Sequence, residues 1–176
     1  MSGHNKWSKI KRQKEKTDSQ KSKIFGKMVR LITVEAKKAG GNASSPNVKA
    51  AIDRARAANV PNENIERAIK KSSEAGATME AITYEAYGPG GCALVIEALT
   101  ENRNKASQEI KAILVRHGFS LASMGAATWA FTRNGDMQWV AQTTIPLSDE
   151  DGEKLGELVD DLEENDEVQE VFTNTE

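Results

Sequence analysis

The residues best suited to chemistry lie at the start of the 176-residue chain, and most of them are cationic. Residues 1–38 hold twelve lysines or arginines against three acids, whereas the whole chain has a net charge of −2. A dense positive surface binds a polyanion because it displaces condensed counterions. Lysine predominates, and it contacts phosphate without reading base identity, so the composition favours structured RNA or non-specific DNA.

The basic character continues to Lys71 and then reverses. Up to Lys71 the chain has eighteen basic and six acidic residues, and beyond it six basic and twenty acidic ones. Trp7 lies between Lys6 and Lys9, where it could stack on a base or bury itself in the protein, and both interpretations stay open. The predicted nucleic-acid-binding set is Lys6, Trp7, Lys9, Lys11, Arg12, Lys14, Lys16, Lys21, Lys23, Lys27, Arg30, Lys37, Arg67, Lys70 and Lys71.

A second phosphate contact is predicted at the beginning of a later helix, formed by Asn102, Arg103, Asn104 and Lys105. Free backbone N–H groups and the helix dipole favour an anion at such a position. Helix capping alone explains Asn102 equally well.

The remaining reactive residue types predict neither catalysis nor a bound metal or cofactor. Cys92 is the only cysteine and stands among apolar residues, so we expect a small buried side chain. His117 precedes a glycine at a predicted helix end, where a cation complements the dipole. No nucleophile, base and orienting residue form a recognisable motif, so we do not expect an enzyme.

Composition also bears on location. No apolar run approaches the roughly 20 residues that span a bilayer, and the basic start lacks the apolar segment of a secretory signal. A single cysteine fits a reducing compartment. We therefore expect a cytoplasmic protein that does not enter a membrane, and the sequence leaves its oligomeric state open.

The basic residues belong to a predicted arm and a three-helix domain. Residues 1–16 hold two large apolar side chains, too few to fix a helix by packing, so we expect a basic arm. Within residues 17–75, apolar residues recur at helical spacing in three stretches. These predicted helices begin near Asp18, at Ser45-Pro46 and at Pro61, and the first is expected to stop at Gly40-Gly41.

Residues 79–176 predict a ferredoxin-like domain. We expect strands at 82–87, 92–99, 128–132, 137–147 and 168–172, and helices at 103–117 and 149–164. Asn134-Gly135 predicts a two-residue hairpin turn. From residue 92 the order is β-α-β-β-α-β, which predicts an α+β fold with two helices on one face of the sheet and residues 82–87 as an extra edge strand.

Several stretches together resemble the YebC family, described as probable transcriptional regulators and including the mitochondrial translational activator of cytochrome c oxidase subunit I. They are SGHNKW at the start, NVPNENIERAIKK at 59–71, YEAYGPGG at 84–91, LTENRNKAS at 99–107 and VAQTTIPL at 140–147. The chain departs from the family pattern at Ala86, where glycine is usual, and at Ala141, where proline is usual. It also lacks the domain that the family inserts near Asn134-Gly135.

The resemblance implies nucleic-acid-linked control of gene expression. Members are treated either as DNA-binding transcription factors or as factors that act on RNA at the ribosome. A protein-interaction adaptor, whose basic face meets an acidic protein surface, is the other interpretation. Residues 147–176 hold thirteen acids and one lysine, so we further expect the acidic C-terminal helix to dock on the basic domain until nucleic acid competes.

Overall fold

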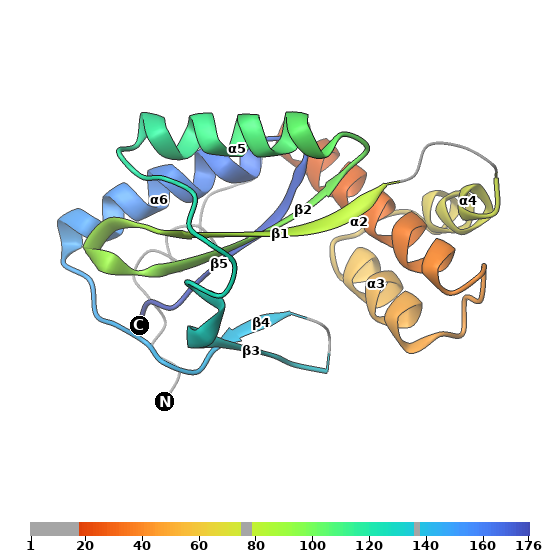
Figure 1. Cartoon of the computed structure of the whole chain (residues 1–176). Coiled ribbons are helices and arrows are strands. Elements are labelled where there is room, and N and C mark those ends of the chain that lie inside the picture. Colours follow the sequence, from red (N-terminus) through yellow and green to blue (C-terminus); the bar gives the residue numbers. More distant parts are fainter. Residues whose placement is uncertain (1–17, 75–78, 136–137) are drawn as a thin grey trace. The chain divides into compact units, whose positions relative to one another are not determined.

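The computed structural model describes residues 18–74, 79–135 and 138–176. The predicted arm, with Trp7 and its neighbouring lysines, lies outside the described residues. The chain divides into two compact units, 16–81 and 82–176, which we call the helical unit and the sheet unit. Helices come first, and antiparallel strands with two further helices follow, which confirms the α+β class (Figure 1).

Three helices pack around a small apolar core in the helical unit, as predicted. Ile32 lies fully buried at the centre of this core, beside Ala55 and Ile65. The first helix ends where Gly40 and Gly41 take positive φ angles, and the Gly41 N–H then bonds the Ala36 carbonyl at 2.8 Å. The helices are α2 (Asp18–Lys38), α3 (Pro46–Ala57) and α4 (Asn62–Ser72).

The sheet unit is built on a central strand that is buried on both faces. Its main sheet has the order β1-β2-β5, so that β2 is central and β1 lies at an edge, as predicted. Helices α5 and α6 cover one face of this sheet (Figure 1), where Leu94 and Ile96 meet Ile110 and Leu158. The elements are β1 (Glu80–Tyr87), β2 (Ala93–Thr100), β5 (Val168–Thr173), α5 (Arg103–Arg116) and α6 (Asp149–Glu164).

The predicted middle hairpin forms a separate ribbon and does not join the main sheet. Strands β3 (Phe131–Arg133) and β4 (Trp139–Ala141) pair only with each other, and both are shorter than the predicted 128–132 and 137–147. Both edges of β2 are taken by β1 and β5, so the hairpin has no place beside the central strand. The connection also exceeds a two-residue turn at Asn134-Gly135, because the Asn134 N–H bonds the Gln138 carbonyl at 3.0 Å.

A glutamate fastens this ribbon to the second face of the sheet. Glu97, on β2, accepts hydrogen bonds from the Trp139 indole at 2.6 Å and from Arg133 at 3.0 Å. The Arg133 guanidinium lies over the Trp139 ring, 4.3 Å from its centre. Ala93 and Val95 pack against the ribbon from the same face of β2.

A second glutamate fixes the loop that leads into the ribbon. Glu85, on β1, is buried, and its carboxylate accepts backbone N–H bonds from Gly125 at 2.6 Å, Ala127 at 2.9 Å and Thr128 at 2.7 Å. Burial alone would raise the pKa of Glu85, but these bonds outweigh burial and hold its pKa below the ordinary value. The carboxylate is therefore the ionised anchor of this loop, which we call the clamped loop (residues 122–129).

Glu85→Gln should destabilise the protein by about 1–3 kcal/mol at neutral pH, because an amide turns a donor toward backbone donors. A lowered folded-state pKa means that the carboxylate stabilises the fold fully above its unfolded pKa and loses this effect as pH falls through the folded pKa. The difference between wild type and variant, measured by urea unfolding, should therefore shrink below about pH 4.5.

Glu157→Gln provides the matched control, since Glu157 lies exposed on α6. It should change the free energy of unfolding by less than about 0.5 kcal/mol at every pH. If Glu85→Gln matched this control, the clamp would contribute nothing to stability.

Candidate nucleic-acid interface

Four predicted contact residues form one stripe along α2. Lys23, Lys27, Arg30 and Lys37 follow one another at intervals of four, three and seven residues, which places them on one face of a helix with 3.6 residues per turn. The apolar residues of α2 point to the core from another face. Lys21 is exposed near the start of α2 and departs from this spacing.

Two of the acids in the helical unit are taken up by nearby cations. Glu35 is buried and accepts a bond from Lys38 at 3.1 Å, so that Lys38 serves the fold. Arg67, a predicted contact residue, pairs with Glu63 at 2.8 Å, and both side chains are exposed. An exposed pair of this spacing contributes only about 0.3–0.5 kcal/mol, so a phosphate can compete for Arg67.

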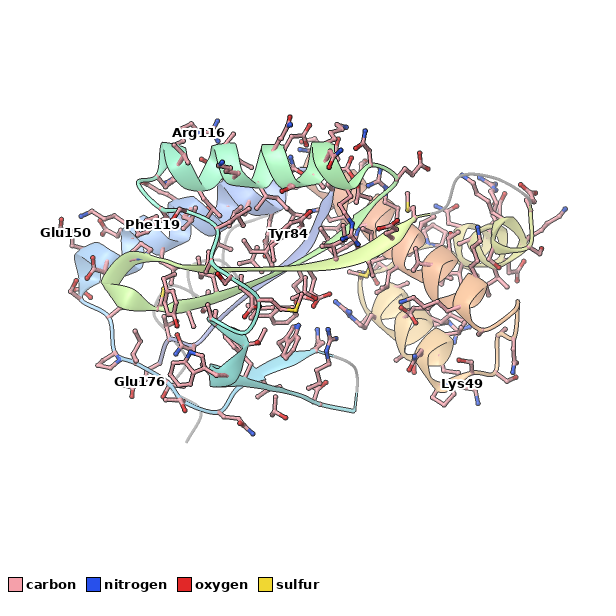
Figure 2. The ribbon with its side chains drawn as sticks, viewed as in Figure 1. Lys49, Tyr84, Arg116, Phe119, Glu150 and Glu176 are labelled. Atoms are coloured by element: carbon pink, nitrogen blue, oxygen red, sulfur yellow. The ribbon has the colours of Figure 1, made fainter. Side chains whose placement is uncertain are left out.

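The other cations of the unit lie on α3 and α4. Lys70 and Lys71 are exposed in the last turn of α4, as predicted. The sequence interpretation left out Lys49 and Arg56, which are exposed on α3, and Figure 2 shows Lys49 at the outer surface of this helix. The signal was present, because α3 carries three basic residues and one acid. Residues 18–74 together hold twelve basic and six acidic side chains.

At the second predicted phosphate site, the lysine already pairs with carboxylates of the protein. Asn102 caps α5 by accepting the Lys105 N–H at 3.1 Å, as one of the two interpretations expected. The Lys105 ammonium lies 3.3 Å from Glu167 and 3.9 Å from Glu109. The hydrogen bond to Glu167, with the charge of Glu109, raises the pKa of Lys105. A phosphate would have to displace two carboxylates here, and the contact of Asn102, Arg103 and Asn104 with phosphate stays a prediction.

The other two candidate residues, Cys92 and His117, have neighbours that explain them as parts of the fold. Burial raises the pKa of the Cys92 thiol to about 11, as expected for an inert side chain. His117 ends α5, and its Nε2 lies 2.7 Å from an oxygen of Asp161.

Within residues 18–74, 79–135 and 138–176, no three histidine, cysteine or acidic side chains gather as a metal site. The same segments contain no helix that is long and apolar enough to span a bilayer.

Docking of the acidic helix α6 on the helical unit stays a prediction, as does the cytoplasmic location. The arm residues from Lys6 to Lys16 lie outside the described part of the chain, so their role also stays a prediction.

Comparison with known families covers nearly the whole chain. The model described as TACO1/YebC protein N-terminal domain matches residues 5–75, which include most of the predicted arm and all three helices of the helical unit. The model described as TACO1/YebC second and third domain matches residues 79–138 and 135–175. The two segments of the second match meet in the connection between β3 and β4.

Individual relatives agree with this assignment. A "probable transcriptional regulatory protein" of Pelotomaculum thermopropionicum is 38% identical over 240 positions, covering 100% of this chain and 99% of the relative. A protein of the same description from Thermotoga maritima is 48% identical over 138 residues, 77% of this chain and 54% of the relative. The crystal structure of the conserved hypothetical protein Aq1575 from Aquifex aeolicus has a TM-score of 0.81 and 28% identity, covering 97% of this chain and 96% of that one.

The Pelotomaculum alignment contains 64 more positions than the 176 residues of this chain. Because the second family match breaks at residues 135–138, we place the extra residues of the relatives at the β3–β4 connection. This connection should therefore accept additional residues in this chain too.

A six-residue Gly-Ser insertion after Gly135 should lower the free energy of unfolding by less than about 1 kcal/mol, because loop closure costs grow only with the logarithm of length. The same insertion after Gly90 is the control, since that turn packs against Leu147, and it should cost several times more. Thermal and urea unfolding measure both. Equal losses at the two positions would contradict the assignment of the β3–β4 connection as the permissive site.

Proposed function

Because the chain belongs to the TACO1/YebC family, whose relatives carry the name probable transcriptional regulatory protein, we propose that it regulates gene expression by binding nucleic acid. The binding surface is the basic face of the helical unit. The observation that carries the proposal is the segregation of charge, with twelve cations in residues 18–74 against six acids. This local excess exists although the whole chain is slightly acidic.

The kind of cation favours phosphate contact over base reading. Eight of the twelve basic residues in 18–74 are lysines, including three of the four on the α2 stripe. Reading bases in the major groove calls for bidentate side chains on a helix, with arginine, asparagine or glutamine the usual ones. Lysines position a sugar-phosphate chain without identifying its sequence. We therefore propose a structured RNA, including that of the ribosome, as the preferred target, with duplex DNA as the alternative.

Neutralising the stripe should weaken binding and reduce its dependence on salt. If about six cations contact duplex phosphates, log K should fall against log salt with a slope near −5. The triple variant Lys23→Gln, Lys27→Gln, Arg30→Gln should make this slope shallower by about 2 to 3. Each phosphate contact that is removed no longer displaces its counterion when the nucleic acid binds. Both slopes can be measured by fluorescence anisotropy with a labelled RNA hairpin and a labelled DNA duplex. The salt concentration should run from about 50 to about 300 mM, where screening changes strongly.

The matched control removes the same charge from the sheet unit, with Lys111→Gln, Arg116→Gln and Lys154→Gln. All three residues are exposed, and Figure 2 shows Arg116 near the end of α5. The control should keep the wild-type slope. Equal weakening by both triple variants would mean that only total charge matters. A wild-type slope near zero, with protein partners retained after nuclease treatment of a lysate, would favour the adaptor interpretation.

A further inference from the structure

An exposed tryptophan stands on the clamped loop of the sheet unit. Trp129 is 60% exposed, and the neighbouring Tyr87 is 39% exposed. The Trp129 indole N–H donates to the Ala126 carbonyl at 2.9 Å and approaches the Tyr87 hydroxyl at 3.1 Å, and that hydroxyl also donates to the Ala126 carbonyl. The polar edge of the indole is thus satisfied within the protein, and much of the ring remains open to solvent.

The platform beneath this ring is held rigidly. Ala127 and Thr128, directly before Trp129, give their backbone N–H groups to the buried Glu85 carboxylate. Gly125 is fixed by the same carboxylate, and Met124 beside it is 98% exposed. A loop anchored in this way loses little conformational entropy when a ligand settles on it. Exposing large apolar side chains on a fixed loop brings the fold no gain, which points to a ligand.

The charge around this loop suits an anionic ligand. Residues 118–135 contain no acid and one arginine, whereas residues 147–176 hold thirteen acids. Glu85 is buried beneath the loop, and Glu97 is engaged by Arg133 and Trp139. The segment itself therefore adds no carboxylate that would repel a phosphate.

The exposed apolar surface around Trp129 is small enough to suit a single base and too small for a stable protein interface. Among the residues that the structure describes, the exposed large hydrophobics are Tyr87, Val115, Met124, Trp129 and Val140. A stable protein interface buries about 800 Å² on each partner, and the side chains of Tyr87, Met124 and Trp129 supply a small part of that area. One aromatic ring is enough to stack one base, and losing that stack raises the Kd roughly tenfold.

We propose that Trp129, supported by Tyr87 and Met124, is a stacking platform for an unpaired base of single-stranded RNA. The inference rests on the proposed function, because the lysines of the helical unit supply the phosphate contacts that bring RNA to the protein. It adds a separate contact on the sheet unit, one that depends on an aromatic face and little on salt. Unpaired bases in RNA loops and ends are the usual targets of such aromatic contacts.

The test uses the full chain and a fluorescein-labelled, unstructured twelve-nucleotide RNA, alone or annealed to its complement, and single-stranded DNA of the same sequence. Trp129→Ala should raise the Kd for the single-stranded RNA roughly tenfold, the size expected from losing one stacked base. The Kd for the duplex and the salt slope should stay unchanged. Trp129→Phe, which keeps an aromatic face, should bind like wild type, and Trp129→Leu should bind like Trp129→Ala.

Val115→Ala is the control, since it removes an exposed apolar side chain from α5, and it should leave every Kd unchanged. As a direct readout, irradiation of a 5-iodouridine-labelled RNA should crosslink a peptide that contains Trp129, as identified by mass spectrometry. Wild-type affinity in both Trp129→Ala and Trp129→Leu, or retained affinity in Trp129→Leu alone, would overturn the stacking proposal. An effect seen only with DNA would overturn the assignment to RNA.

These outcomes are distinct from failure of the proposed function. Wild-type protein that binds RNA with a steep salt slope, while the Trp129 variants bind equally well, leaves the basic interface standing and removes only the platform. Wild-type protein that binds none of the three nucleic acids removes both.

Discussion

The sheet unit depends on one strand, β2, that is dry on both faces and hydrogen-bonded on both edges. One face is held by apolar packing, where Leu94 and Ile96 meet the two helices. The other face is held differently, because it carries one glutamate, Glu97, and the neighbouring strand β1 carries a second, Glu85. Glu97 binds the ribbon and Glu85 binds the loop before it. A buried carboxylate is costly unless several donors meet it, so Glu85 depends on the backbone geometry of the loop as much as it fixes that geometry.

This arrangement explains why acids in the sheet unit cannot be treated as one class. Glu85, Glu97 and Glu167 each accept hydrogen bonds from defined donors and belong to the fold. The acids of α6 pair more locally, as Glu150 does with Lys154 and Asp161 with His117, and together they give this helix an excess of negative charge. In the helical unit, Glu35 and Glu63 each pair with one cation, and residues 18–74 together hold twelve basic and six acidic side chains. Local pairing therefore preserves, and does not cancel, the separation of charge along the chain.

Periodicity and capping residues predicted most of the elements, because both are local properties. Gly40-Gly41 and Asn102 ended and began their helices as expected. The errors concern partners that are distant in sequence. Lys105 resembles an anion contact until Glu167, 62 residues away, is brought beside it. The hairpin strands were found, but their exclusion from the main sheet depends on which strands occupy the edges of β2. Glu85 gave no signal as an anchor, since its three donors lie about forty residues further along the chain.

The two proposed contacts, of lysines with phosphates and of Trp129 with a base, differ in physical character. Lysine–phosphate contacts act over a distance of about 8–10 Å at physiological salt and orient a strand only loosely. An aromatic ring acts on contact and fixes one base, so it can select an unpaired segment within a strand that the lysines have already gathered. Both sets of residues precede the β3–β4 connection, at which the relatives carry their additional positions. The two proposed contacts therefore draw on no residue that follows the β3–β4 connection.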